Sequence, residues 1–259
     1  MNLNQRAAGI LLHITSLPGP HGIGDFGPDA YRFVDWLSSA KQTLWQWLPT
    51  TPVGPGDSPY QSPSAFAGSP LMVALEPLLE RGWLERIELP AEGFDSLRVD
   101  FPRVIPWREA HLRRAALGFF DKADAEQRTS FTAWCRQQAS WLDEYALFMA
   151  LFNAHGMKPW WEWGEPLRTR VKRALAQARA QHAQEIHYQC FVQWCWDTQC
   201  RALKKYANDK GIALIGDIPI YVADNSADVW SRPDLYELGV DGLPTVIAGV
   251  PPDDLGPDG

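Results

Sequence analysis

The stretch "GILLHITSLPGPHGIGDFGPDAYRFVDWLSSAKQTLWQWLP", residues 9–49, decides the fold of this chain. Its first part, Gly9–Thr15, is a short and nearly continuous apolar run, which is typical of a strand buried on both faces of a parallel sheet. After a Gly- and Pro-rich turn, apolar residues at helical spacing predict a helix over Pro28–Ala40. The run Thr43–Pro49 predicts a second buried strand. Strand, helix and strand in this order predict a βαβ unit.

The remainder of the chain adds one more strand and several helices. A long helical stretch from about Leu167 to Asp209 ends near Gly211, and the run Ile212–Ile215 predicts a third buried strand. Between Leu75 and Pro166 the pattern is irregular, with short polar segments and a helix expected over Trp141–Ala154. The predicted organisation is strands 1 and 2 with a long loop in residues 1–74, an inserted and mostly helical subdomain in 75–165, and helix, strand 3 and a last loop in 166–259.

Each predicted strand is followed by a polar, Pro-rich loop. A doubly wound sheet and a (β/α)8 barrel can both begin in this way. In either fold, chemistry is located at the carboxyl ends of the strands. The chain ends in a loop, "PPDDLGPDG", and a barrel requires eight strands. A barrel interpretation therefore predicts an incomplete, N-terminal part of the fold.

Composition excludes several classes of partner. The 259 residues carry a formal net charge of −7, which argues against binding to nucleic acid or to an acidic membrane surface. The sequence contains no signal-peptide pattern and no apolar run of membrane-spanning length. The four cysteines match no zinc or redox motif, so we expect buried, reduced thiols and a cytoplasmic protein. The oligomeric state is left open.

One motif resembles a dinucleotide fingerprint. "GIGDFG", Gly22–Gly27, has the spacing G-x-G-x-x-G between a predicted strand and a predicted helix. However, "SLPGPH" separates the strand from the first glycine, and the second strand ends in Gln46 and Pro49 rather than near an acidic residue for a ribose. A nicotinamide-dependent dehydrogenase is therefore the weakest of the functional hypotheses.

The loop "GDSPYQSPSAFAG", Gly56–Gly68, is unusual because it contains Tyr60 but no Lys, Arg or Glu. A sugar ring can stack on such a tyrosine while the phenol bonds a hydroxyl, with Ser58 and Gln61 as further polar contacts. The alternative is that Tyr60 only pins its own loop. Asp217 follows the third strand directly. It is either a functional acid at the carboxyl end of the sheet or a structural residue that caps a helix or forms a salt bridge with a loop. We expect His13 to be buried and hydrogen-bonded.

Several blocks together resemble the amylomaltases, which are 4-α-glucanotransferases. They are "GILLHITSLPGPHGIGDFG", "WQWLPTTPVGPGDSPYQSPSAFAGSP", "DEYALFMALFNAHG", "IGDIPIYVADNSADVW" and "PTVIAGVPPD". These blocks lie in the family's order between residues 9 and 253. The resemblance implies a (β/α)8 barrel with inserted subdomains between the second and third strands. It also implies transfer of α-1,4-glucan segments between maltodextrins with retention at the anomeric carbon and without a cofactor.

The resemblance also assigns roles to individual residues. Tyr60 corresponds to the stacking tyrosine at the cleavage subsite, Ser58 to a nearby polar contact, and Asp217 to a substrate-binding acid after the third strand. Asp253 corresponds to a residue of the lid loop over the active site. Asp254 and Leu255 follow it where many relatives have two aromatic residues, which leaves stacking by the lid open.

The family's nucleophile, acid/base glutamate and third aspartate correspond to positions past Gly259. The resemblance therefore implies no catalytic residue and no metal site in this chain, and an inactive fragment when the chain is alone. A non-catalytic α-glucan-binding module and an α-glucan hydrolase of the same clan are the alternative functions. Which glucan lengths the protein prefers is left open.

Overall fold

Three short parallel strands form the sheet. The computed structural model describes residues 6–86, 93–95, 97–246 and 249. Within these residues, β1 (Gly9–Leu11), β2 (Leu44–Gln46) and β3 (Ala213–Ile215) lie in the order β1-β2-β3. Both neighbouring pairs are parallel, and Trp45 lies opposite Ile10 on one side and Leu214 on the other. The three predicted strands and their parallel arrangement are thus confirmed.

The predicted βαβ unit is confirmed as well. Helix α1 (Pro28–Ser39) connects β1 to β2, and Pro28 stands in its first turn, where a missing N–H costs no hydrogen bond. Its buried residues Ala30, Val34 and Leu37 lie at the predicted helical spacing. They pack in one core cluster with Trp45 of the central strand.

The expectation that the first strand is buried on both faces is wrong. Ile10 and Leu12 pack against the core formed with α1, whereas Leu11 is 57% exposed. β1 is an edge strand within the described part of the sheet. The strand is also shorter than predicted, because the chain turns into the 3₁₀ helix η1 (Ile14–Ser16).

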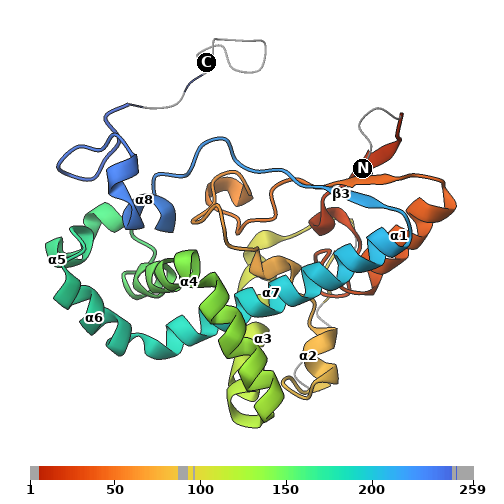
Figure 1. Ribbon diagram of the computed structural model, residues 1–259, viewed down its shortest axis with the longest axis horizontal. Helices are drawn as coiled ribbons and strands as arrows, with labels where there is room; N and C mark the ends of the chain where they lie inside the picture. Colours follow the sequence, from red (N-terminus) through yellow and green to blue (C-terminus); the bar gives the residue numbers. More distant parts are fainter. Residues whose placement is uncertain (1–5, 87–92, 96, 247–248, 250–259) are drawn as a thin grey trace.

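Helix α7 (Ala183–Asp209) is the long central helix of the molecule (Figure 1). It contacts α1, α3, α4, α6 and β3. It ends at Asp209, with Lys210 as the C-cap, and the φ of 79° at Gly211 fits the predicted helix end. The other elements are α2 (Glu76–Glu80), α3 (Phe101–Lys122), α4 (Ala125–Ala154), α5 (Glu165–Arg168), α6 (Lys172–Gln181), α8 (Ala227–Ser231), η2 (Pro55–Asp57), η3 (Pro70–Met72), η5 (Trp160–Glu162) and η6 (Pro233–Leu235).

The region between the second and third strands differs from the prediction. Helix α3 and the first half of α4 occupy residues for which short polar segments were expected. Pro102 lies in the first turn of α3, where proline is tolerated, and Pro106 lies within the helix. A capping box between Asp124 and Gln127 starts α4 well before Trp141. The predicted stretch 167–209 is divided into α5, α6 and α7.

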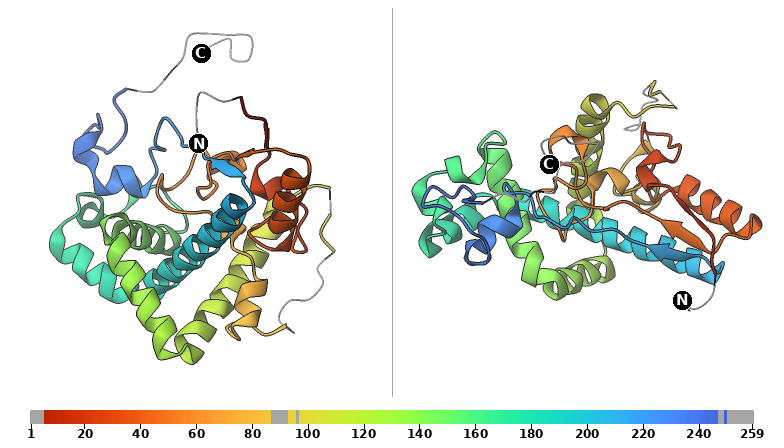
Figure 2. Two further views of the ribbon diagram at one scale, coloured as in Figure 1. Left: turned by 45° about the vertical axis from the view of Figure 1, so that its right-hand side comes forward. Right: turned by 90° about the horizontal axis from the view of Figure 1, so that it is seen from above.

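The helices surround α7 on several sides (Figure 2). One core cluster joins Val73, the short helix α2, α3 and α7, so residues from all three predicted segments share it. None of the helices in the described part of the chain is both long and apolar enough to cross a membrane.

The Gly22–Gly27 motif has a structural role in this fold. Oδ2 of Asp25 lies 3.0 Å from Nη2 of Arg108 on α3, and the two side chains are 3% and 1% exposed. Arg108 also donates to the carbonyl of Val73, and Oδ1 of Asp25 accepts from the backbone N–H of Gly27 over 2.9 Å. Burial raises the pKa of Asp25, against the opposing effect of Arg108. The carboxyl group of Asp25 thus already accepts the hydrogen bond from the backbone N–H of Gly27, which a bound pyrophosphate would require.

Candidate functional site

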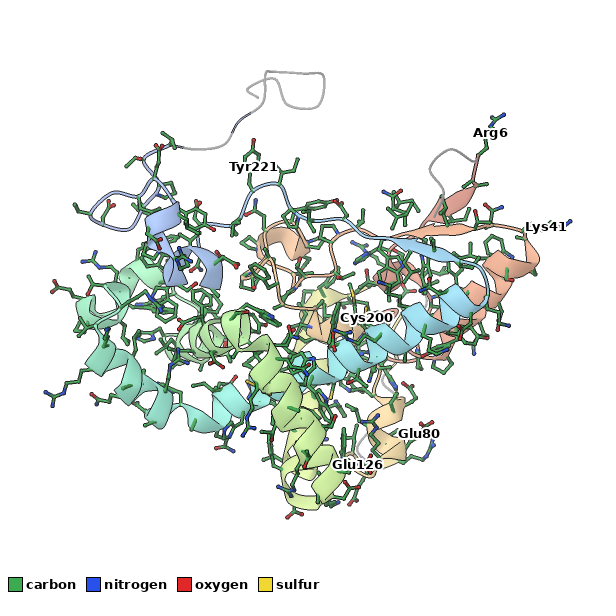
Figure 3. All side chains as sticks on the ribbon, viewed as in Figure 1. Arg6, Lys41, Glu80, Glu126, Cys200 and Tyr221 are labelled. Atoms are coloured by element: carbon green, nitrogen blue, oxygen red, sulfur yellow. The ribbon has the colours of Figure 1, made fainter. Side chains whose placement is uncertain are left out.

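The site lies at the carboxyl ends of β2 and β3. The backbone N–H of Trp47 donates to the carbonyl of Ile215 over 2.9 Å, so the two strands leave the sheet side by side. The loop with Tyr60 follows β2, and Asp217 follows β3 after one residue. From there the chain runs back across the molecule to α8, and Tyr221 projects from this segment (Figure 3).

The first half of the loop folds back on itself. Gly56 and Asp57 both have positive φ, 70° and 56°. A Cβ on Gly54 would lie 1.6 Å from the carbonyl oxygen of Gln61, so only glycine allows this close approach. The hydroxyl of Thr51 donates to the carbonyl of Pro59 over 2.6 Å. These contacts fix the backbone on both sides of Tyr60.

Tyr60 and Asp217 are in direct contact. The Tyr60 hydroxyl donates to Oδ2 of Asp217 over 2.7 Å, and Tyr60 is 42% exposed. This hydrogen bond raises the pKa of Tyr60, because it stabilises the protonated phenol. Ser58 also belongs to the group, since its Oγ accepts from the backbone N–H of Tyr60 over 3.3 Å.

The second half of the loop is anchored by buried polar side chains. The Ser64 hydroxyl accepts from the N–H groups of Phe66 and Ala67. The buried side chain of Gln193 on α7 accepts from Gly68 N over 2.7 Å and donates to Gly68 O over 2.9 Å. Ala65 N donates to Asp228 of α8 over 2.9 Å.

A cavity of about 580 Å³ adjoins the loop. Gln61 and Pro63 of the loop line it, together with side chains of α3, α4 and α7 and residues 223–225. Most of the lining side chains are aromatic or aliphatic. Tyr60 and Asp217 lie outside it, on the open surface. Gln61 therefore belongs to the loop and to the cavity, and Tyr60 presents an accessible ring.

The structure thus brings together three of the residues named from the sequence, Ser58, Tyr60 and Asp217. Asp253, Asp254 and Leu255 lie outside the described residues. His13 is buried as expected, and burial lowers its pKa to about 4, but the hydrogen-bond expectation is wrong for one atom. Its Nδ1 is buried and has no hydrogen-bond partner among the described residues.

Sequence reasoning missed the residues that hold the loop. Gln193 and Asp228 lie on helices, where polar residues usually face solvent. One signal of buried glutamines was present in the sequence. In the segment "YQCFVQW" of α7, two glutamines lie among apolar residues of types that are usually buried. In the part of the chain that the structure describes, no group of three or more His, Cys, Asp or Glu side chains is placed to hold a metal ion.

The fold and site define a helix-rich α/β protein with a small parallel sheet and a tyrosine–carboxylate pair at the carboxyl ends of neighbouring strands. The sequence profile of the 4-alpha-glucanotransferases matches residues 12–259. The chain belongs to this family.

Individual relatives agree with this assignment. The chain is 49% identical to a 4-alpha-glucanotransferase of Thermus thermophilus over 96% of its own length and 49% of the relative's. It is 40% identical to a 4-alpha-glucanotransferase of Streptococcus pneumoniae, over 98% of its own length and 50% of the relative's. A solved amylomaltase from Streptococcus agalactiae, in complex with acarbose, superposes with a TM-score of 0.93 at 39% identity, over 98% of this chain and 51% of the other. The chain therefore spans about half the length of these relatives.

Proposed function

We propose that this chain is the N-terminal part of a 4-α-glucanotransferase whose complete fold is a (β/α)8 barrel. β1, β2 and β3 are its first three strands, and residues 75–165 are the insertion between the second and the third. The parallel order of the strands, the family membership and the half-length match to the relatives support this proposal. We also retain the division into residues 1–74, 75–165 and 166–259, and a cytoplasmic location, as parts of the proposal.

The contact between Tyr60 and Asp217 carries the proposal for the site. The exposed ring of Tyr60 offers a flat apolar face on which a glucose unit stacks. Its hydroxyl keeps a lone pair that accepts from a sugar hydroxyl while its proton points to Asp217. The carboxylate of Asp217 accepts from a second sugar hydroxyl, and Ser58 holds the backbone of Tyr60. A loop without Lys, Arg or Glu suits a neutral substrate.

The reaction is a two-step transfer with retention. A carboxylate attacks the anomeric carbon while a carboxylic acid protonates the leaving oxygen, and the 4-OH of another glucan then resolves the glycosyl ester. Retention by this route requires two carboxyl groups about 5–5.5 Å apart. We assign these groups to the remainder of the protein. The role of this chain is to position the donor glucan and to favour a sugar over water, without a cofactor.

The test uses the complete protein with maltotriose as the only substrate. We expect glucose and maltodextrins longer than maltotriose. Release of glucose and maltose without chain lengthening would identify an α-glucan hydrolase instead. Absence of any turnover, together with saturable binding of maltohexaose, would identify a non-catalytic glucan-binding module.

A second experiment tests the site separately from catalysis. The amylomaltase relative was solved with acarbose, so we expect acarbose to bind the present protein as well. Calorimetric titration of the complete protein should give a lower affinity for Tyr60→Ala than for the wild type. Equal affinities would remove Tyr60 from the site while leaving the family assignment intact.

A further inference from the structure

The loop Gly56–Gly68 is bonded to the first turn of α8. The backbone N–H of Ala227 donates to the carbonyl of Pro63 over 2.8 Å, and Oδ2 of Asp228 accepts from the backbone N–H of Ala65 over 2.9 Å. An N–H in the first turn of a helix has no partner within the helix, so that of Ala227 is available to the loop. Two hydrogen bonds therefore hold the loop against the start of α8.

The loop also contacts the chain that leads into α8. Residues 216–226, the connecting segment, run from β3 to α8 (Figure 1). Near the start of this segment, Asp217 accepts the 2.7 Å hydrogen bond from the hydroxyl of Tyr60. The loop is thus bonded at one place to the connecting segment and at another to the helix that follows it. Each contact limits how far the two stretches of chain can separate at the other contact.

Tyr60 needs such an anchor because it is remote from the sheet along the chain. Asp217 follows the last residue of β3 by two positions, whereas Tyr60 follows the last residue of β2 by fourteen. The sheet therefore fixes Asp217 directly, and the placement of Tyr60 beside it depends on what holds the loop. Tyr60 is 42% exposed, so water competes for its bond to Asp217. Contacts elsewhere in the loop must keep the two side chains together.

Asp228 is the side chain that makes this anchor. It is half-buried, and burial raises its pKa against the opposing effect of the Ala65 N–H. Burying a carboxylate is costly unless its oxygens are hydrogen-bonded, and a charged acceptor forms a stronger hydrogen bond than a neutral one. Capping α8 is not the role of Asp228, because the hydroxyl of Ser226 accepts from the backbone N–H of Val229 over 3.2 Å. The carboxyl group of Asp228 instead holds the loop.

We propose that Asp228 is a positioning residue for the glucan-binding pair Tyr60 and Asp217. The inference rests on the proposed function and gives Asp228 an effect on glucan affinity that acts through Tyr60. With its bond to Ala65 intact, the loop is held where the Tyr60 hydroxyl reaches Asp217. Without that bond, the loop is displaced for part of the time, and the apparent dissociation constant rises as the fraction of protein with the pair formed falls. Bound glucan restores the pair, so the rate of the chemical step changes little.

The experiment uses the complete protein and measures acarbose affinity by calorimetric titration, together with KM and kcat for maltotriose. Asp228→Ala should raise both the dissociation constant and KM by about threefold to tenfold, whereas kcat should change by less than about twofold. Asp228→Asn keeps an oxygen that accepts from Ala65 and should recover most of the affinity. Asp234→Ala, which removes an exposed aspartate paired with Arg232, is the matched control and should bind as the wild type does. A loss of kcat without a change in KM in Asp228→Ala would overturn the proposal.

A double-mutant cycle separates positioning from a general loss of structure. If Asp228 acts through Tyr60, its removal should matter less once the tyrosine is absent. In the Tyr60→Ala background, Asp228→Ala should therefore weaken acarbose binding by less than about twofold. Equal losses in the two backgrounds would overturn the proposal. Urea denaturation accompanies each variant, and Asp228→Ser, whose side chain is too short to reach Ala65, replaces Asp228→Ala if the alanine variant does not fold.

The wild type distinguishes this proposal from the proposed function. A wild type that lengthens maltotriose and binds acarbose, together with an Asp228→Ala variant of equal affinity, would overturn the positioning role alone. A wild type that neither lengthens maltotriose nor binds acarbose would overturn the proposed function, and the role of Asp228 with it.

Discussion

The hydroxyl of Tyr60 donates a hydrogen bond to Oδ2 of Asp217 over 2.7 Å, although 157 positions separate the two residues in the chain. The contact exists because β2 and β3 are parallel neighbours, so their carboxyl ends lie at the same edge of the sheet. Both residues are reached by solvent, and water competes for such a bond, which limits its contribution to stability. Its principal effect is to orient the ring of Tyr60.

Removal of this bond should lower activity more than stability. On the proposed function, we expect Tyr60→Phe in the complete protein to reduce the initial rate of glucose release from maltotriose by about tenfold, which corresponds to the loss of one hydrogen bond to a carboxyl group. Tyr60→Ala, which also loses the stacking face, should cost about another tenfold. The control is Tyr206→Phe, because Tyr206 makes an equivalent 2.7 Å bond to Asp35 away from the site. Equal rates in the two Phe variants would argue against a role for the pair.

The close approach of Gly68 to α7 gives a second prediction. A Cβ at this position would lie 2.1 Å from the ring of Trp196, and the backbone of Gly68 is bonded on both sides to Gln193. Gly68→Ala should therefore destabilise the fold by about 1–3 kcal/mol in urea denaturation. Gly164→Ala is the control, since a Cβ there meets nothing within 4 Å. A Gly68 variant as stable as this control would contradict so close an approach of the loop to α7.

Local patterns predicted the elements whose signal lies within one segment. The strand–helix–strand unit of residues 9–49 and the acid after the third strand follow from hydrophobic periodicity and from chain order. Helix α3 was missed because prolines and polar residues interrupt its pattern, although Pro102 is harmless in a first turn. The strands were predicted too long, and at β1 this is because the chain turns into η1 at Ile14.

Contacts that depend on tertiary structure could not be predicted. Gln193 and Gln199 of α7 each bind both backbone groups of a single residue, Gly68 and Ala74 respectively. The two glutamines are six residues apart, and so are the two residues that they hold. Only the folded arrangement reveals this match, because a glutamine in a helix is ordinarily solvent-facing. For Tyr60 and Asp217, the sequence likewise predicted only that both residues follow the carboxyl ends of strands, and not that they are in contact.

The buried pair of Asp25 and Arg108 gives a third prediction. Asp25→Ala leaves a buried guanidinium without its counter-ion, and we expect a loss of about 3–5 kcal/mol in the free energy of unfolding. The double variant Asp25→Ala with Arg108→Met should recover much of this loss, because no buried charge remains unpaired. Asp234→Ala, which breaks the exposed pair with Arg232, should leave the urea midpoint unchanged. A double variant less stable than Asp25→Ala would contradict this account.

The buried His13 should make stability depend on pH in a defined window. Burial lowers its pKa to about 4, below the value of about 6.5 of an exposed histidine. Between these values the unfolded chain binds a proton that the folded chain does not, so the free energy of unfolding falls as pH is lowered from about 6.5 to about 4. The contribution of His13 amounts to at most about 3 kcal/mol at pH 4 and vanishes above about pH 7. Urea denaturation of the wild type and of His13→Gln between pH 7 and pH 4.5 measures it, because carboxylate effects are common to both proteins. The wild type should lose more stability than the variant on acidification, and parallel pH profiles would show that His13 titrates normally in the folded protein.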